Sequence, residues 1–476
     1  MATITLNNLR APQDVEGQPL QSHGGHILSC NGYFYLYGED RRAGLKVSCY
    51  RSRDLVSWEY RGTALSIDSP VVGYPLTRTD RRLRNPQLDP QKTWNIGVTI
   101  ERPKVLYNQR TGKYVMWMHF EDGNNYLCAH AAVASCDTPD GAFVYHGSFR
   151  PAGHMSRDCT LFQDDDGTAY FISAARDNAD LHIYRLTQDY MAIDTLVASI
   201  FPQQFREAPA LFKRNGIYFM VSSECTGWEP NQGRYSWARR IEGPWADHQP
   251  FGSPTTNDTQ PAFVLEIPGS KGQGFLYVGD RWDPTDYFNS RYIALPFTFP
   301  TQTSLDMAWA DTVDIDLDTG VVSTAMESGD GPVRIASRGT DDYVTLPRGT
   351  EPGRPVGSIR LDYQNPAQLF DLQPVEGGQV RIVGRASGLA LASYSHEVVA
   401  AYPSDDPNQL WKLEPQAENL TLIRAHDGRV MAMQGEQHAQ ATLSVETQAA
   451  YFDTSWFHSP QGFIIAPVVG QDPIPE

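Results

Sequence analysis

Apolar and polar residues between positions 23 and 300 follow one arrangement that recurs about every 50 residues. Each unit runs from an apolar segment through a glycine turn to an aromatic segment, and then to a polar segment that ends in an Asp or Gly-Pro-Trp turn. The aromatic segments are NGYFYLYGE, GKYVMWMHF, DGTAYFISA, NGIYFMVSS and QGFLYVGD. Aromatic and β-branched segments between turn residues are typical of β-strands. Five units of about four strands each predict a five-bladed β-propeller.

The pattern changes after WADTVDIDLDTGVVSTAMES, a segment that we expect to supply the closing strands of the ring. Three further units open with VRIASRGTDDYVTL, VRIVGRASGLALA and TLIRAHDGRVMAM, and they close at Gln368, Gln409 and Thr454. Units of about 41 to 47 residues predict a β-trefoil. The predicted fold class is therefore all-β, with a propeller over residues 1–328 and a trefoil over residues 329–476. We expect the trefoil to be a separate module that adds avidity for a polymer rather than chemistry.

Composition narrows the range of partners. The 476 residues include 39 basic and 56 acidic side chains, a net charge of −17, so we expect no nucleic acid and no anionic membrane as a partner. No apolar segment approaches the roughly 20 residues of a membrane span, and MATITLNNLRAPQD lacks the features of a signal peptide. We expect either a processed extracellular protein or a cytoplasmic one. The six cysteines lack metal-binding spacing, which leaves buried thiols or one or two disulfides as alternatives.

Four units open with a polar residue that a purely structural propeller does not need. These residues are Glu101 in IERPKVLYN, Asp158 in SRDCTLFQDDDG, Glu207 in REAPALFK and Gln260 in NDTQPAFV. The innermost strands of a propeller converge on its central funnel, so side chains at these starts can meet there. The Ala-Pro-Ala segment after Glu207 predicts partial desolvation, which raises a carboxyl pKa and suits a general acid. A surface or turn-capping role is the alternative for each residue taken alone.

Groups suited to a sugar lie near these positions. SSECTGWEPN combines an aromatic platform for the C–H faces of a sugar with groups that bind hydroxyls, and further candidates occur in NNYLC, RDNADLHIYRL and YLYGED. The candidate substrate-binding residues are Thr226, Trp228, Asn231, Tyr126, Asn178 and Glu39. Turn formation explains the last three equally well.

These segments resemble glycoside hydrolase family 43, and within it the exo-β-1,3-galactanases. The resemblance rests on HGG at 23–25, IERPKV, SRDCTLFQDDDGTAY, REAPALFK, SSECTGWEPN, the Thr-Gln-Pro of NDTQPAF and RYIALPF, and it covers about residues 20–325. The C-terminal region is similar to ricin-type trefoils of carbohydrate-binding module family 13. The resemblance implies an inverting enzyme that removes galactose from the non-reducing end of β-1,3-galactan, the backbone of arabinogalactan. It implies no cofactor and no metal.

The resemblance also implies roles for the four polar residues. Glu207 matches the general acid, Asp158 the residue that tunes the pKa of the acid, and Glu101 a carboxylate close to the reacting sugar. Most family members have an aspartate base on the first strand, whereas this chain has SHGGH there, a departure that the galactanases share. In those enzymes a glutamine, matched by Gln260, is thought to act as the base through its imidic acid tautomer. Gly24 and Gly25 would let substrate or backbone approach closely.

Three alternatives stay open from the sequence. An amide is a very poor base, so a water held between Gln260 and Glu101 could be activated mainly by the glutamate. The substrate could be that of an α-L-arabinofuranosidase or a β-xylosidase of the wider family, or the chain could be a galactan-binding propeller without catalysis. The trefoil units match the core signature of ricin-type repeats better than the sugar-binding signature.

Overall fold

The computed structural model describes residues 3–42, 44–75, 77, 98–325, 331–416, 420–433, 441–448 and 460–469. These residues form β-strands and four single-turn 3₁₀ helices, η1 (Pro151–Gly153), η2 (Tyr287–Asn289), η3 (Pro366–Gln368) and η4 (Pro407–Gln409). The all-β fold class is confirmed. Among the helices of the described part, none has the length and apolarity needed to span a bilayer.

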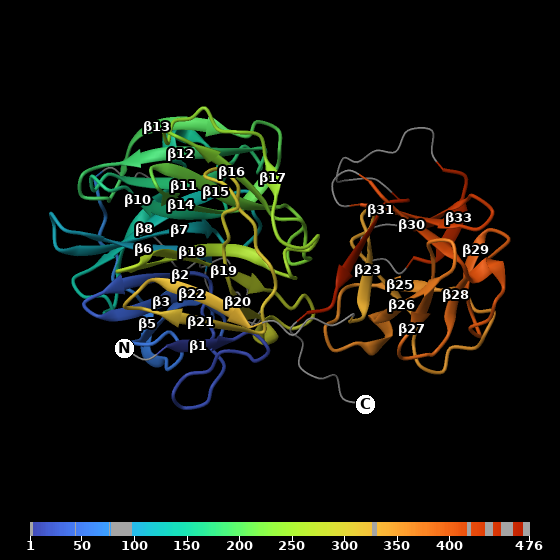
Figure 1. Cartoon of the computed structure of the whole chain (residues 1–476). Helices are drawn as coiled ribbons and strands as arrows, with labels where there is room; N and C mark the ends of the chain where they lie inside the picture. The colour runs from blue at the N-terminus through green and yellow to red at the C-terminus, as the bar shows by residue number, and fades with distance from the viewer. Residues whose placement is uncertain are drawn as a thin grey trace.

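The N-terminal domain consists of antiparallel sheets that follow one another along the chain (Figure 1). Four of these sheets have four strands each: β2 (His23–Cys30), β3 (Tyr33–Asp40), β4 (Lys46–Ser52) and β5 (Glu59–Leu65); β6 (Thr99–Asn108), β7 (Lys113–Glu121), β8 (His130–Cys136) and β9 (Val144–Phe149); β10 (Cys159–Gln163), β11 (Ala169–Ala175), β12 (Asp180–Leu186) and β13 (Ile193–Ile200); β14 (Arg206–Arg214), β15 (Ile217–Glu224), β16 (Arg234–Ala238) and β17 (Gln249–Pro250). A fifth sheet contains β18 (Gln260–Gly269), β19 (Gly272–Arg281) and β20 (Arg291–Pro296).

The first strands of these five sheets form the centre of the domain. Each of β2, β6, β10 and β14 contacts the first strand of the following sheet, and β18 contacts β2, so the five strands close a ring. A separate sheet joins β1 (Ile4–Asn7), β21 (Thr312–Asp316) and β22 (Val321–Ala325), and β22 contacts β19. The architecture is propeller-like. The count of five blades stays a prediction, because this separate sheet packs beside the fifth.

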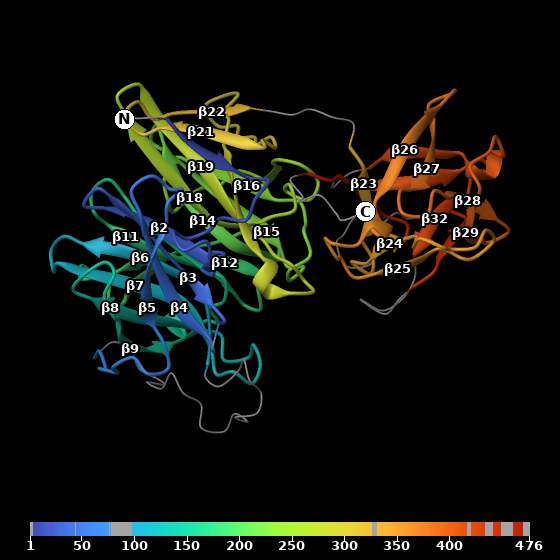
Figure 2. The ribbon, with the colours of Figure 1, turned by 90° about the horizontal axis from the view of Figure 1, so that it is seen from below.

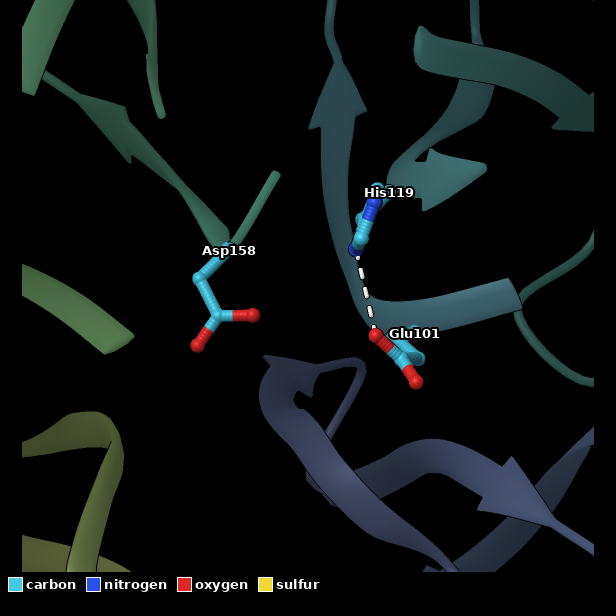
Figure 3. Close-up of side chains that lie close together, drawn as sticks. All are labelled: Glu101, His119 and Asp158. Carbon is cyan, nitrogen blue, oxygen red and sulfur yellow. Dashed lines mark ion pairs between the residues drawn. The ribbon is translucent and has the colours of Figure 1, made fainter. Parts of the chain in front are cut away.

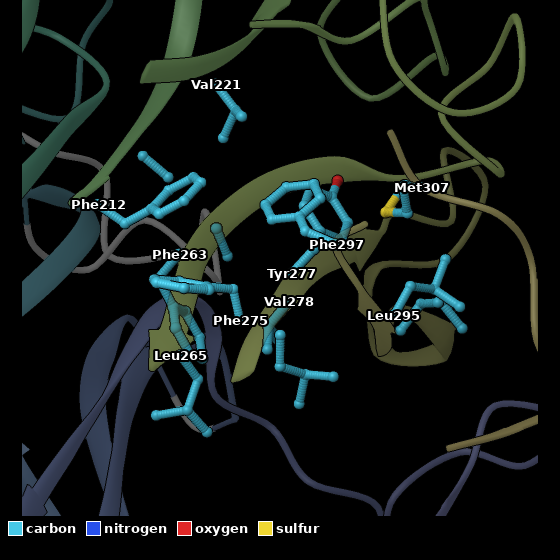
Figure 4. Close-up of a cluster of buried hydrophobic side chains, with 14 of the residues drawn as sticks. Phe212, Val221, Phe263, Leu265, Phe275, Tyr277, Val278, Leu295, Phe297 and Met307 are labelled. Atoms are coloured by element: carbon cyan, nitrogen blue, oxygen red, sulfur yellow. The ribbon is translucent and has the colours of Figure 1, made fainter. Parts of the chain in front are cut away.

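The aromatic segments of the sequence are the second strands of the sheets, and they are buried almost continuously rather than on alternate residues. β7 is buried over eight of its nine residues, and β15 is buried throughout. Neighbouring sheets cover both faces of these strands. Neither face is exposed to solvent, so apolar and polar residues need not alternate along them. The largest such cluster includes Phe212, Phe275, Tyr277 and Phe297, whose rings meet at centroid distances of 5.0 to 5.7 Å (Figure 4). Edge-to-face and offset contacts of this kind stabilise the packing between sheets.

The C-terminal domain is one connected twelve-strand sheet, as a β-trefoil requires. Its strands are β23 (Val333–Ser337), β24 (Tyr343–Thr345), β25 (Gly357–Ile359), β26 (Phe370–Val375), β27 (Gln379–Gly384), β28 (Ala390–Tyr394), β29 (Glu397–Ala401), β30 (Trp411–Pro415), β31 (Thr421–Ala425), β32 (Val430–Met433), β33 (Leu443–Glu446) and β34 (Phe463–Pro467). The buried Gln368 and Gln409 each bind backbone groups of the preceding segment, so the repeat signature is structural. Thr454 lies outside the described residues.

The two domains lie side by side in both views (Figures 1 and 2). The predicted boundary at residues 328 and 329 falls outside the described residues, between β22 and β23, and it stays a prediction. All six cysteines, which are described, are free thiols. Of the two alternatives left by the sequence, the structure therefore contains thiols rather than disulfides.

Candidate active site

A β-bulge at the start of the inner strands aims the predicted catalytic residues. The register between β6 and β7 shifts directly after Glu101, that between β14 and β15 after Glu207, and that between β18 and β19 one residue after Gln260. Arg102 and Ala208, which follow the two glutamates, have φ values of 54° and 50° in the left-handed region. Bulges occur next to active sites because they redirect a side chain. Equivalent strand starts thus present three polar side chains to one point.

A cavity of about 180 Å³ lies at this point. It is smaller than the roughly 300 to 1,000 Å³ of common ligand pockets, which suits a single sugar ring rather than several. The cavity is lined by Gly24, Glu39, Arg41, Glu101, Arg102, Tyr126, Asp158, Glu207, Gly227, Trp228, Gln260 and Trp282. All four predicted catalytic residues are in this set, and four predicted substrate-binding residues accompany them. Gly25, Asn178, Thr226 and Asn231 are absent from the lining.

Glu207 has the environment of a general acid. Burial raises its pKa to about 8, the negative charge of Asp158 adds to the rise, and the Arg102 guanidinium opposes it. Asp158 is fixed in turn, because its Oδ2 accepts a hydrogen bond from the Ala208 amide at 3.1 Å and lies 3.2 Å from Arg102. Asn178 donates to Glu207 Oε2 at 3.3 Å, so it contacts the acid. A carboxyl group with this pKa keeps its proton at neutral pH.

The amide of Gln260 is held on both sides. Its Oε1 accepts hydrogen bonds from Arg102 and from Trp282 Nε1, the latter at 2.8 Å. Both partners are donors only, which fixes the amide orientation. The Nε2 atom donates to Glu207 Oε1 at 2.9 Å and to Ser223 Oγ at 3.0 Å. An imidic acid tautomer would place a hydrogen on the oxygen that faces two donors, so the geometry suits an amide that holds Glu207.

Glu101 has the opposite environment. Its carboxylate accepts a hydrogen bond from the Tyr126 hydroxyl at 2.6 Å and lies 3.1 Å from His119 Nδ1 (Figure 3). The other ring nitrogen of His119 lies 2.8 Å from Glu121, which also accepts from the Ala129 amide at 2.9 Å. Burial alone would lower the pKa of His119, but the two glutamates outweigh it and raise this pKa to about 9. Burial would raise the pKa of Glu101, but His119 and Tyr126 hold it well below its usual range.

Ligand atoms of Glu101, His119 and Asp158 lie within 4.8 Å of one another, a spacing that could hold a metal ion (Figure 3). Both nitrogens of His119 already face carboxylates, so its ring is an imidazolium without a lone pair for a metal. The Arg102 guanidinium lies 3.2 Å from Asp158 and would repel a cation. These residues therefore fit a network of ion pairs better than a metal centre.

The SHGGH segment covers the start of β2, the inner strand of the first sheet, and its residues have different roles there. His23 occupies the position that glutamates occupy in other strands, but its ring is fully buried and lies 3.4 Å from Asp280, outside the cavity. Gly24 lines the cavity with φ of 59°, a left-handed conformation that favours glycine, and the Arg102 side chain packs beside it, 3.4 Å from where a Cβ would stand. A Cβ on Gly25 would lie 1.8 Å from the Tyr37 carbonyl oxygen. Gly25 thus serves close packing between strands rather than substrate contact.

An aromatic wall forms one side of the cavity. The rings of Trp228 and Trp282 stack at 5.6 Å with an interplanar angle of 14°. The Arg41 guanidinium lies 5.2 Å from the Trp228 ring and 4.3 Å from that of Tyr287. Burial raises the pKa of Glu39 to about 8 although Arg41, 3.7 Å away, opposes the rise. The wall offers an apolar face for sugar C–H groups beside a carboxyl group that can donate a hydrogen bond.

Thr226 and Asn231 use their polar groups within their own loop. The Thr226 hydroxyl donates to the Glu229 carbonyl at 2.6 Å and accepts from Asn231 Nδ2 at 2.7 Å. Asn231 also bonds both backbone groups of Glu224, at 3.1 Å. Both side chains are buried. They shape the loop that presents Trp228.

Several functional residues were not found from the sequence. Arg102 follows Glu101 directly, and Arg41 follows Glu39 by two residues. A basic residue this close to a candidate acid was the sequence signal that could have identified both arginines. Trp282 follows the fifth aromatic strand and His119 ends an apolar one, and neither position carries a distinctive motif.

Comparisons with known proteins identify relatives of both domains. The model of glycosyl hydrolases family 43 matches residues 103–265, and the model of the ricin-type beta-trefoil lectin domain-like family matches residues 366–446. A solved exo-β-1,3-galactanase from Clostridium thermocellum is 33% identical, with a TM-score of 0.60, over 98% of this chain and 100% of that one. An exo-β-1,3-galactanase from Phanerochaete chrysosporium, solved with galactose, is 25% identical with a TM-score of 0.60, over 97% and 100%.

A putative exo-β-1,3-galactanase from Bifidobacterium bifidum is 31% identical with a TM-score of 0.55, over 63% of this chain and 95% of that one. No curated protein sequence matches the chain significantly. The range that the family model matches contains Asp158 and Glu207, and the similarity to the Clostridium protein extends over both domains. The chain is therefore a glycoside hydrolase, and it belongs to glycosyl hydrolase family 43.

Proposed function

We propose that the protein is an exo-β-1,3-galactanase that removes galactose from the non-reducing end of β-1,3-galactan, the backbone of arabinogalactan. The observation that carries this proposal is a small cavity lined by two glutamates in opposite environments: burial and Asp158 raise the pKa of Glu207 to about 8, whereas His119 and Tyr126 hold the pKa of Glu101 low. The solved relatives with this architecture are named as exo-β-1,3-galactanases, which supports galactan as the substrate. A cavity for one ring supports release of single sugars from a chain end.

The environments of the two glutamates divide the chemistry between them. Glu207 donates its proton to the glycosidic oxygen as the bond from that oxygen to C1 breaks. A water attacks C1 from the opposite face of the sugar, and its proton passes to Glu101. Asp158 keeps Glu207 protonated in the resting enzyme through its negative charge. One displacement of this kind inverts the configuration at C1.

The position of Gln260 supports Glu101 as the group that activates the water. In inverting enzymes the acid and the activating group stand roughly 6.5 to 9.5 Å apart, because a water must fit between the sugar and the activating group. Gln260 Nε2 lies 2.9 Å from Glu207 Oε1, which leaves no room for a water between them. Gln260 then holds the acid in place, and Glu101 is the carboxylate that hydrogen bonds and charge keep ionised.

Product analysis tests the proposal. The protein should release galactose alone from β-1,3-galactan and no sugar from arabinan or xylan. Proton NMR in the first minutes should show α-galactose from this β-linked substrate, before mutarotation. Arabinose or xylose would instead identify an arabinofuranosidase or a xylosidase. Binding of galactan without any product would identify a non-catalytic propeller, and initial β-galactose would overturn inversion.

A further inference from the structure

The trefoil contacts the loop that carries Trp228. This loop, residues 224–231, begins at the last residue of β15 and is called the Trp228 loop below. Arg360 of the trefoil donates from Nε to Glu229 Oε1 at 2.6 Å, and Arg338 of the trefoil forms an ion pair with Glu224. Both glutamates are nine-tenths or more buried as residues. Two arginines of one domain thus neutralise two buried acids of the other.

The Trp228 loop leads from these arginines to the catalytic groups. Glu229 accepts the Thr226 hydroxyl through its carbonyl, which makes the loop a closed turn with Gly227 and Trp228 at its tip. Trp228 stacks on Trp282, and the indole nitrogen of Trp282 donates to Gln260 at 2.8 Å. Contacts are continuous from Arg360 to the amide that holds the general acid.

A second contact zone meets the segment just before Gln260. Arg281 donates to the Asn257 carbonyl at 2.8 Å and to the Val469 carbonyl of the C-terminal domain at 3.1 Å. Arg334 of the trefoil lies 4.0 Å from Asp258. Asn257 and Asp258 have left-handed φ values of 54° and 57°, a conformation that surrounding contacts must maintain. The trefoil therefore borders both segments, the Trp228 loop and residues 257–258, next to the cavity wall that Trp228 and Gln260 form.

We propose that the trefoil is a positioning part of the active site, in which Arg360 and Arg338 hold the Trp228 loop in its sugar-binding orientation. Hydrolysis of short substrates then depends on these arginines, although neither contacts the sugar. This inference rests on the proposed function, because it assigns the same cavity to a galactoside. It also replaces the expectation that the trefoil is an independent module.

Single substitutions in the full-length protein test the inference. Arg360→Met and Arg338→Met keep the aliphatic stem and remove the charge, so Glu229 or Glu224 loses its ion pair with the trefoil, although Glu224 keeps Arg206 at 3.6 Å. Each should lower kcat/KM on β-1,3-galactobiose about tenfold, mainly through KM, because Trp228 binds ground and transition states alike. Arg360→Lys restores the charge and should recover most of the loss. Arg385→Met is the matched control, since Arg385 pairs with Asp371 inside the trefoil at 2.8 Å.

Hydrogen exchange gives a readout that does not depend on the substrate. Arg360→Met should speed amide exchange in residues 224–231, whereas Arg385→Met should not. Wild-type kcat/KM together with wild-type exchange in both arginine variants would overturn the inference. An inactive wild-type protein would refute the proposed function alone, because the exchange experiment still decides whether the trefoil orders the loop.

Discussion

Glu101 and Glu207 start equivalent strands of different sheets, yet their surroundings give them opposite protonation states. Glu207 lies beside a neutral amide and near the negative charge of Asp158, and its pKa is raised to about 8. Glu101 lies between a tyrosine hydroxyl and the imidazolium of His119, and its pKa is held low. Desolvation alone would raise both pKa values. Burial therefore sets the raised pKa of Glu207, with Asp158 adding to it, whereas at Glu101 the neighbouring hydrogen bonds and charges overcome burial.

Of the substitutions that test the different roles of Glu207 and Glu101, removal of the acid should cause the largest loss of kcat. Glu207→Gln should lower kcat about 10²- to 10⁴-fold on galactobiose, because the leaving oxygen loses its proton source. An aryl galactoside, whose leaving group needs little protonation, should lose much less. Circular dichroism checks that the fold persists. Galactobiose activity within about tenfold of the wild type would exclude Glu207 as the acid.

The next effect should come from the opposite carboxylate. Glu101→Gln should lower kcat on galactobiose about 10²-fold, because the water loses its anionic partner. Gln260→Ala should cost less, about tenfold, because it loosens Glu207 without removing the acid or Glu101. Parallel measurement of kcat for both variants makes the comparison. A larger loss of kcat for Gln260→Ala than for Glu101→Gln would show that Gln260, rather than Glu101, activates the water.

Asp158→Asn should reduce the difference between the pKa values of the two glutamates by lowering that of Glu207. Without this negative charge the pKa of Glu207 falls, so the basic limb of the pH profile of kcat/KM should move to lower pH. The loss of rate at the pH optimum should be smaller than for either glutamate. Asp165→Asn is the control, because Asp165 is exposed and pairs with Lys213 away from the cavity. An unshifted basic limb would remove Asp158 from this role.

His119→Gln should reduce the same difference between the two pKa values by raising that of Glu101. The pKa of Glu101 should rise once the imidazolium is gone, and the acidic limb of the pH profile should move to higher pH. The raised pKa of His119 means that its stabilising contribution is fully present below pH 6.5 and is lost as the pH rises through about 9. Urea unfolding of both proteins from pH 6 to 9 measures this. A stability difference that stays constant with pH would contradict the imidazolium assignment.

Repetition made much of the fold and part of the site predictable from the sequence. A strand pattern that recurs along the chain predicts stacked sheets, and equivalent positions in the repeats predicted that Glu101, Glu207 and Gln260 meet. Arg41 and Trp282 are not predicted, because neither the charge that follows Glu39 nor the tryptophan after the fifth aromatic segment shows in the sequence whether its side chain reaches the cavity. A hydroxyl or amide looks the same in a sequence whether it binds sugar or its own loop. For this reason Thr226 and Asn231 were assigned to substrate.

The pairing of β1 with β21 has a consequence for the order of events during synthesis. Ile4 lies opposite Ile315, and Leu6 lies opposite Val313. At about 5 to 20 residues per second, a ribosome needs roughly 15 to 60 s to make the partner strand after the first one has emerged. The early strand must wait with its backbone unpaired, and contacts of such long sequence separation form slowly. The contact of β18 with β2 also joins distant parts of the chain, so the cavity, which Gly24 and Gln260 both line, cannot close before β18 has been made.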